Sequence, residues 1–189
     1  ICKCESETFK AYTDAKEACP CRAEMTIETQ IKKYDKFFSG RYKMGEAVIR
    51  ATADLENKNP ALRTFPLARI NTNKHARVGN KHIVWPNMNL SVAIDDTLMK
   101  LTHVIRGKDH EINTERQNML QKALGFEKPV YFHIGRMKFT DLTLSKSELS
   151  KKIEDKEFTG WDDPRVPSLL AYRKRGYKPE AFRKFILSL

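Results

Sequence analysis

Four cysteines in two closely spaced pairs are the first residues of the chain whose types and spacing suit a chemical role. Cys2 and Cys4 form one pair, and Cys19 and Cys21 form the other. Four thiolates suit tetrahedral zinc, and a closed set of four sulfurs holds a metal for structure rather than for catalysis. Two disulfides are the alternative. Because no secretory signal opens the sequence, we expect a reducing, cytoplasmic setting and favour zinc.

The run His103-Val-Ile-Arg-Gly-Lys-Asp-His110 supplies a second candidate site. The guanidinium of Arg106 can bind a carboxylate through two parallel hydrogen bonds, so we expect Arg106 to bind an acidic substrate. Asp109 and His110 are expected to shape the same substrate-binding loop. An ion pair between Arg106 and Asp109 is the alternative.

The run Leu144-Ser-Lys-Ser147 supplies a third candidate site. A lysine on a loop can approach a triphosphate and neutralise the negative charge that moves to the leaving pyrophosphate. Ser147 is expected to cap a helix that continues to about Glu154. On its own, Lys146 would be interpreted as a surface lysine in a turn.

A strand, a helix and a second strand are predicted around Arg106. Thr102–Arg106 and Val130–Ile134 have the apolar, β-branched composition of buried strands. The helix between them is predicted to begin at a capping box of Thr114 and Gln117 and to end at Gly125. This order favours a parallel pair with a crossover helix, and therefore an α/β fold. Ligands bind beyond the carboxyl ends of such strands, which would bring residues 106–110 and 144–147 to one edge.

Further elements follow from periodicity and turn signals. Ile27, Ile31, Tyr34, Phe37 and Phe38 recur at helical spacing within 26–38, and we favour a core face over a platform for stacking nucleic-acid bases. Asp95 and Asp96 could form a metal or acid–base pair, but a surface turn or helix cap is favoured. The other predicted helices are 6–15, one from about 167 to 175 and one from 179, and the other predicted strands are 47–51, 67–70, 82–85 and 90–94.

Six motifs along the chain together carry a family resemblance. In chain order they are Trp85-Pro86, Ala93-Ile-Asp-Asp96, His103–His110, Asn113-Thr-Glu-Arg-Gln117, Leu144-Ser-Lys-Ser147 and Gly160-Trp-Asp-Asp-Pro-Arg165. Together they resemble the second half of the catalytic domain of an archaeal-type glutamyl-tRNA synthetase, a class I aminoacyl-tRNA synthetase. The run Leu144–Ser147 is similar to the mobile lysine signature of that class.

The resemblance implies an architecture and a set of site residues. It implies part of a Rossmann-type parallel sheet, with residues 1–80 as a zinc-binding insert for the tRNA acceptor end. Residues 81–142 would be the second catalytic half, and residues 143–189 the lysine-signature loop with a helical stem-contact region. Structural zinc would lie on the four cysteines. The implied catalytic and ATP-binding residues are Leu144, Ser145, Lys146 and Ser147, and the implied substrate-binding residues are Arg106, Asp109 and His110.

Two departures from the family pattern concern the substrate and the nucleotide. The family usually has a tyrosine where this chain has Met88 and, in bacterial members, often an asparagine where it has Val92. His133-Ile-Gly-Arg136 resembles the lead-in to the lysine loop rather than the first nucleotide signature. We therefore expect that signature to precede Ile1, and expect these residues alone to be inactive.

Composition is compatible with this interpretation. The 189 residues carry a formal net charge of +11 and are 40% hydrophobic, which suits a folded chain with a polyanionic partner. No run approaches the length of a membrane span. The resemblance implies a monomer whose partners are tRNA, Mg-ATP and glutamate. The resemblance to the acceptor-end region also suits several cations to phosphate contacts, namely Arg50, Arg63, Arg69, Lys74 and Arg77. As isolated residues, each would instead be interpreted as a solvated surface cation. The alternatives are a glutaminyl-tRNA synthetase, which Arg106 disfavours, and a non-catalytic zinc-structured nucleic-acid-binding module.

Overall fold

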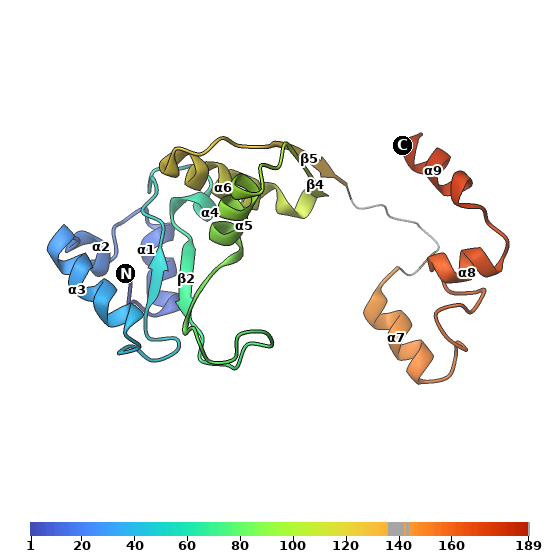
Figure 1. Cartoon of the computed structure of the whole chain (residues 1–189), viewed down its shortest axis with the longest axis horizontal. Coiled ribbons are helices and arrows are strands. Elements are labelled where there is room, and N and C mark those ends of the chain that lie inside the picture. The colour runs from blue at the N-terminus through green and yellow to red at the C-terminus, as the bar shows by residue number, and fades with distance from the viewer. Residues whose placement is uncertain (136–141, 143, 189) are drawn as a thin grey trace. The chain divides into compact units, whose positions relative to one another are not determined.

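The structure, a computed structural model, describes residues 1–135, 142 and 144–188. The chain divides into two compact units, residues 1–135 and residues 136–189, and each is described by itself (Figure 1). Arg136, the last residue of the predicted lead-in to the lysine loop, lies outside the described residues. Among the described residues, no helix is both long and apolar enough to cross a membrane.

Helices and strands alternate through the first unit. In chain order they are α1 (Ser6–Asp14), α2 (Pro20–Ala23), α3 (Ile27–Phe38), β1 (Val48–Arg50), α4 (Pro60–Arg63), β2 (Pro66–Ile70), β3 (Val84–Pro86), α5 (Met88–Leu98), β4 (His103–Gly107), the 3₁₀ helix η1 (Lys108–His110), α6 (Glu111–Leu124) and β5 (Val130–Ile134). The second unit contains α7 (Lys146–Glu154), α8 (Leu169–Lys174) and α9 (Pro179–Leu187).

Two small sheets organise the first unit. Strands β1, β2 and β3 form an antiparallel sheet, in which Val48 pairs with Arg69 and Ile70 pairs with Val84. Strands β4 and β5 form a parallel pair, in which Arg106 lies opposite His133. Helix α6 connects the parallel strands, so the predicted crossover is confirmed. In Figure 1, α5 and α6 lie between the antiparallel sheet and this strand pair.

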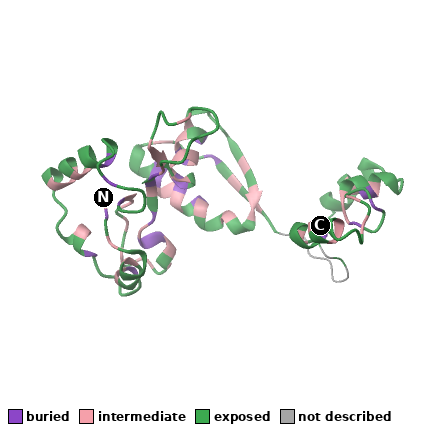
Figure 2. Cartoon of the chain, turned by 90° about the horizontal axis from the view of Figure 1, so that it is seen from below, coloured by how far each residue is buried: buried purple, intermediate pink, exposed green. Residues whose placement is uncertain are grey.

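Buried residues form two small apolar clusters rather than one large core. Phe37, Tyr42, Ala47 and Ile70 pack together beside the antiparallel sheet. Phe65, Ala93 and Leu120 form the second cluster, which joins α5 and α6. Figure 2 shows the buried residues in small groups within a largely exposed or half-exposed chain. The second cluster fixes the helices that lie against the parallel strands.

The predicted strand at 90–94 is wrong, because these residues lie in α5. Leu90, Val92 and Ile94 alternate as they would in a strand. The residues that α5 buries are instead Asn89, Ala93 and Asp96, which recur at the spacing of a helix. The adjacent carboxylates of Asp95 and Asp96 therefore belong to a helix, neither to a strand nor to a turn.

Both predicted serine and threonine caps are misplaced. Helix α6 begins at Glu111, and Thr114 is buried within its first turn instead of preceding it. Helix α7 begins at Lys146, and its cap is Ser145, whose hydroxyl accepts a hydrogen bond from the Glu148 amide. The predicted end of α6 is confirmed, because Gly125 takes the left-handed conformation with φ of +71°.

Helix α3 buries less of its apolar face than the periodicity predicts. Thr26 caps the helix and Phe37 is fully buried. The other apolar residues of that face are exposed, namely Ile27, Ile31, Tyr34 and Phe38. The prediction of a core face is therefore right for Phe37 alone.

The second unit has the two predicted C-terminal helices. Ser168 caps α8 by accepting a hydrogen bond from the Ala171 amide, and Gly176 follows the helix with φ of +86°. Pro179 opens α9. Between α7 and α8, the carboxylate of Asp163 is buried and accepts hydrogen bonds from Thr159 and Arg165. This turn is organised by these polar contacts together with the fully buried side chain of Val166.

Candidate functional site

Arg106 lies near the carboxyl end of β4, where a ligand of a parallel sheet is expected. Its Nη2 donates a hydrogen bond of 2.9 Å to Oε1 of Gln117 on α6. Its guanidinium carbon lies 4.6 Å from the centroid of the Tyr131 ring on β5. Two different elements therefore hold this cation beside the strand pair.

A chain of buried amides continues from Arg106 into the helices. Gln117 is fully buried, and its Nε2 donates to Oδ1 of Asn89 on α5 at 3.2 Å. Gln121, also fully buried, donates to the Ala93 carbonyl and accepts from the Tyr131 hydroxyl, each at 3.4 Å. Buried polar groups favour one arrangement of the surrounding elements when their hydrogen bonds are satisfied. Here α5 and β5 supply the partners of both glutamines.

A carboxylate lies close to the same cation. Asp96 is 9% exposed, and burial raises the pKa of its carboxyl above the usual range, whereas the positive charge of Arg106 partly opposes that rise. Asp96 Oδ2 and Arg106 Nε are both buried, and neither has a hydrogen-bond partner among the described residues. Among the described residues, the guanidinium makes one hydrogen bond, through Nη2 to Gln117.

The loop after β4 does not neutralise Arg106. Among the described residues, the ion pairs include no Arg106–Asp109 contact; Asp109 lies 3.9 Å from Nε2 of His110 instead. His110 Nδ1 contacts Asn113 at 3.0 Å, and Asp109 is exposed. The alternative role of Arg106, an ion pair with Asp109, is therefore not observed. Asp109 and His110 follow β4 in η1, next to Arg106.

The four cysteines are brought together at the start of the chain. The sulfurs of Cys2, Cys4 and Cys19 lie within 4.8 Å of one another, and Cys21 Sγ lies 3.8 Å from Cys4 Sγ. All four are free thiols, so the alternative of two disulfides is not observed. Four sulfurs around a zinc ion at the usual Zn–S length form a tetrahedron with edges of about 3.8 Å. Three of the sulfurs, those of Cys2, Cys4 and Cys19, are therefore close enough to share one metal ion, and Cys21 lies beside Cys4 as the candidate fourth ligand.

Electrostatics around the cysteines also favour a cation at the centre. Burial, together with hydrogen bonds to Cys2 and Cys21, raises the pKa of the Cys4 thiol to about 12. The Lys3 amide donates to Cys21 Sγ at 3.5 Å, an outer contact that orients the sulfur. Without a cation, the Cys4 sulfur is therefore protonated at neutral pH.

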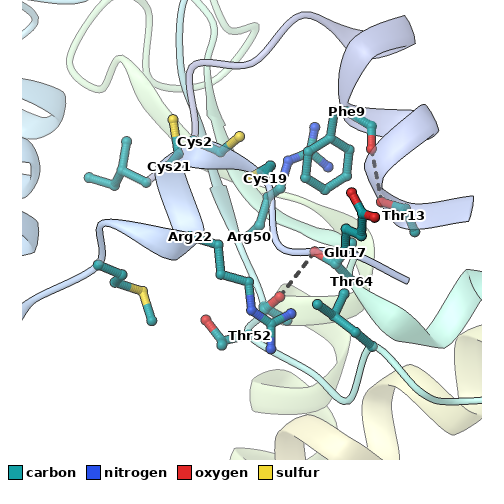
Figure 3. A pocket seen from close by; sticks show the side chains of 14 residues that line it. Cys2, Phe9, Thr13, Glu17, Cys19, Cys21, Arg22, Arg50, Thr52 and Thr64 are labelled. Carbon is teal, nitrogen blue, oxygen red and sulfur yellow. Dashed lines mark hydrogen bonds between the residues drawn. The ribbon is translucent and has the colours of Figure 1, made fainter. Parts of the chain in front are cut away.

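Two arginines line the cavity next to this cysteine set (Figure 3). The Arg50 guanidinium carbon lies 3.7 Å from the centroid of the Phe9 ring. Arg22 donates to the Ala53 carbonyl at 2.9 Å. Their positive charges would partly offset the negative charge of metal-bound thiolates in the same cavity.

Lys146 lies at the first position of α7 in the second unit. Its side chain is exposed, as are those of Leu144 and Ser147, whereas Ser145 is half-buried and caps the helix. The prediction that residues 144–147 share an edge with Arg106 stays a prediction.

The whole chain, residues 1–189, matches the protein family described as "tRNA synthetases class I (E and Q), catalytic domain". The chain belongs to this family. It is 42% identical over 189 residues to a glutamate–tRNA ligase of Methanopyrus kandleri, and 43% identical over 190 residues to one of Thermococcus kodakarensis. Each alignment covers 100% of this chain and 33% of the relative. The chain thus spans about a third of the length of these relatives.

A solved structure of a glutamate tRNA ligase from Elizabethkingia meningosepticum also matches, with 21% identity and a TM-score of 0.36. The match covers 77% of this chain and 30% of that one. A TM-score this low does not by itself establish a shared fold. The membership of this synthetase chain in its family follows from its sequence.

Sequence reasoning missed the residues that support Arg106 in this synthetase chain. Gln117 was interpreted as half of a capping box, and Asn89 received no role. The signal was a polar stripe at helical spacing, Thr114, Gln117 and Gln121, on a helix that should bury apolar residues there. Thr114 also contacts His133 Nε2 at 2.8 Å, which ties α6 to β5.

One predicted phosphate contact of the synthetase chain is wrong. Arg63 is only 6% exposed, and it donates to the carbonyls of Thr13 and Asn57, each at 2.8 Å. It therefore joins α1 to the loop between β1 and α4 and is not available to a phosphate.

Proposed function

We propose that this chain is part of a glutamate–tRNA ligase. In the first step, a carboxylate oxygen of glutamate would attack the α-phosphorus of ATP and release pyrophosphate. In the second step, a hydroxyl of the terminal ribose of tRNA would attack the activated carbonyl and release AMP. The relatives named glutamate–tRNA ligase, which are 42–43% identical over the whole chain, support the reaction.

The observation that carries the choice of substrate is the environment of Arg106. Its guanidinium lies at the carboxyl end of β4, is held by a neutral amide and an aromatic ring, and has no ion pair among the described residues. A cation supported in this way can bind the side-chain carboxylate of glutamate with both of its parallel donors. Glutamine offers no charge there. Asp109 and His110 would complete the wall of the same pocket.

Lys146 would act on the nucleotide. Its ammonium group would neutralise charge on the triphosphate of Mg-ATP as pyrophosphate leaves, and Leu144, Ser145 and Ser147 would form the surrounding loop. Ser145 would fix the position of this loop relative to α7 by capping the helix. The proposed catalytic and ATP-binding residues are therefore supplied by one helix terminus.

Zinc is the proposed metal of the four cysteines. It would supply a structural crosslink between residues 2–4 and residues 19–21, with no part in the reaction. The sulfur geometry and the free state of all four thiols support this choice.

The proposed organisation assigns residues 1–80 to a zinc-bound insert that contacts the tRNA acceptor end. Residues 81–142 would form the second half of the Rossmann-type catalytic domain, and residues 143–189 the lysine loop and the stem-contact helices. The net charge of +11 supports a tRNA partner, because cationic surfaces bind phosphate. A monomeric, cytoplasmic enzyme is the simplest form that fits protein synthesis.

The test is tRNA charging by the full-length protein that contains this chain. We expect it to attach radiolabelled glutamate, and R106K to raise the KM for glutamate about 10- to 100-fold, because lysine keeps the charge but loses the paired donors. R116K is the matched control, since Arg116 also lies over an aromatic ring, Phe65, and donates to the Ala61 carbonyl. R116K should leave the glutamate KM unchanged. Absence of glutamate charging, or an unchanged KM in R106K, would contradict the proposal.

A further inference from the structure

We infer that Gln117 is a positioning residue that orients the Arg106 guanidinium to receive the substrate carboxylate. The inference rests on the proposed function, because it concerns the group that Arg106 binds. Gln117 is fully buried on α6, and its Oε1 accepts the Nη2 proton of Arg106 at 2.9 Å. A buried amide aimed at an arginine is a specific feature, because an unpaired amide at that place would be costly.

The direction of the Gln117 amide is fixed from its other end. Arginine has only donors, so the carbonyl oxygen of Gln117 must face Arg106 and its NH₂ group must find an acceptor elsewhere. Oδ1 of Asn89 is that acceptor, at 3.2 Å, and Asn89 is itself 8% exposed on α5. A reversed amide would set donor against donor at Arg106. Helix α5 therefore determines which group α6 presents to β4.

Tyr131 and Gln117 restrain Arg106 in different ways. The Tyr131 ring lies 4.6 Å from the guanidinium carbon, and the attraction between a cation and a ring is not tied to any one N–H, so it does not stop the guanidinium from rotating. The hydrogen bond to Gln117 removes that rotation. Binding a carboxylate through two parallel hydrogen bonds requires both restraints. Gln117 is also neutral, so it positions the cation without cancelling its charge.

The chain supplies a matched control one turn further along the same helix. Gln121 is also fully buried on α6, but it bonds to the Ala93 carbonyl and the Tyr131 hydroxyl and makes no hydrogen bond to Arg106 among the described residues. Q117M and Q121M remove the same amide group from equally buried positions. A general loss of packing or stability would affect the two variants alike, whereas only Q117M removes the direct hydrogen bond to Arg106.

The experiment measures tRNA charging by the full-length protein at saturating tRNA and ATP. For Q117M we expect the KM for glutamate to rise about 10-fold, the cost of one hydrogen bond to a charged group, with the KM for ATP unchanged. Q121M should raise the glutamate KM clearly less than Q117M, even where its melting temperature falls as far, because Gln121 reaches Arg106 only through the Tyr131 hydroxyl. Equal KM values in wild type and Q117M, or an equal rise in both variants, would overturn the inference.

A second variant keeps the test decisive if Q117M does not fold. Q117E keeps the shape of the side chain and one acceptor facing Arg106, but pairs the guanidinium with a carboxylate. We expect its glutamate KM to rise and its preference for glutamate over glutamine to fall, because Arg106 is then neutralised. An unchanged preference would overturn the inference. Wild-type protein that charges no glutamate would overturn the proposed function and this inference with it, whereas wild-type charging with an unaltered Q117M would overturn the inference alone.

Discussion

Lys146 occupies a position that is unfavourable for its own helix. It is the first residue of α7, where the helix dipole and the free amides present positive charge. Its side chain is exposed, and the ion pairs among the described residues do not include it. The helix is held instead by the Ser145 cap and by Leu149, which is buried. A lysine that the helix does not need for stability fits the proposed action on a triphosphate.

K146Q should therefore separate activity from stability. We expect the rate of tRNA charging to fall about 100-fold or more, because one charge-neutralising group is lost from the transition state. The melting temperature should stay the same or rise slightly, because an unfavourable charge is removed from the helix start. The matched control is K151Q, which removes an exposed lysine from the last turn of the same helix. Wild-type charging by K146Q would exclude the proposed role.

Single residues of the site could be predicted from type and spacing to different extents. The two cysteine pairs and Arg106 can be singled out from residue type and spacing. The structure brings the cysteines together, whereas the role of Arg106 in binding substrate stays a prediction. The support that Gln117 gives to Arg106 cannot be predicted in this way. Thr114 and Gln117 have the spacing of a capping box, which predicts a different role for Gln117. Only the three-dimensional structure shows that α6 begins earlier, at Glu111, and that Gln117 points to Arg106.

At the scale of elements, the strand–helix–strand prediction holds and the α5 prediction does not. Strands β4 and β5 are short apolar runs separated by a helical pattern, and their order alone favours a parallel pair. The alternation of Leu90, Val92 and Ile94 masked a helix whose buried side includes the polar residues Asn89 and Asp96. Periodicity counts apolar residues, so it fails where a functional site buries polar ones.

The turn between α7 and α8 depends on one buried carboxylate. Asp163 is 3% exposed, and its oxygens accept from the amides of Thr159 and Arg165, each at 3.0 Å, and from the Arg165 guanidinium at 2.8 Å. These bonds, that of the Arg165 side chain first, hold the pKa of Asp163 far below its usual range. The ionised form is therefore the one that stabilises this turn.

D163N should loosen this turn without unfolding its helices. We expect faster hydrogen exchange at the amides of Thr159 and Arg165, because the asparagine can accept fewer of the bonds that protect them. The depressed pKa means that the contribution of Asp163 is complete above the unfolded value of 3.8 and is lost as the pH falls through the folded value. The difference in hydrogen-exchange protection between wild type and D163N should therefore be constant from neutral pH to about 4, and should shrink at lower pH.

The matched control for this prediction is D162N. Asp162 is the exposed neighbour of Asp163 and pairs with Lys174 at 2.9 Å on the surface. Exposed ion pairs contribute little to stability, so exchange at Thr159 and Arg165 should be close to wild type in D162N. Equal protection in wild type and D163N would show that the apolar contacts, not the carboxylate, hold the turn.

At the scale of the whole molecule, the first unit has a modest apolar core for its length. Two small clusters carry most of the fully buried apolar side chains, and polar bonds from Arg63, Arg116 and Gln117 join the elements around them. In a chain with so little apolar burial, a metal crosslink would supply a larger share of the stability of the folded state than in a chain with a large apolar core. The cysteine set lies where such a crosslink would matter, since Cys2 pairs with Val48 at the edge of the antiparallel sheet.

Removal of zinc should therefore loosen the sheet edge as well as the cysteine loops. The amides of Cys2 and Val48 each donate to the carbonyl of the other at 2.9 Å, and we expect both to exchange faster after chelation. A metal present at a thousand times its Kd stabilises the folded state by about 4 kcal/mol, so the melting temperature should also fall on chelation. Zinc should restore both properties and magnesium should not, because thiolates select the softer metal. Purified protein that contains no zinc and weighs four hydrogens less than the reduced chain would instead establish two disulfides. Unchanged exchange at Val48 on chelation would show that the sheet edge forms without the metal.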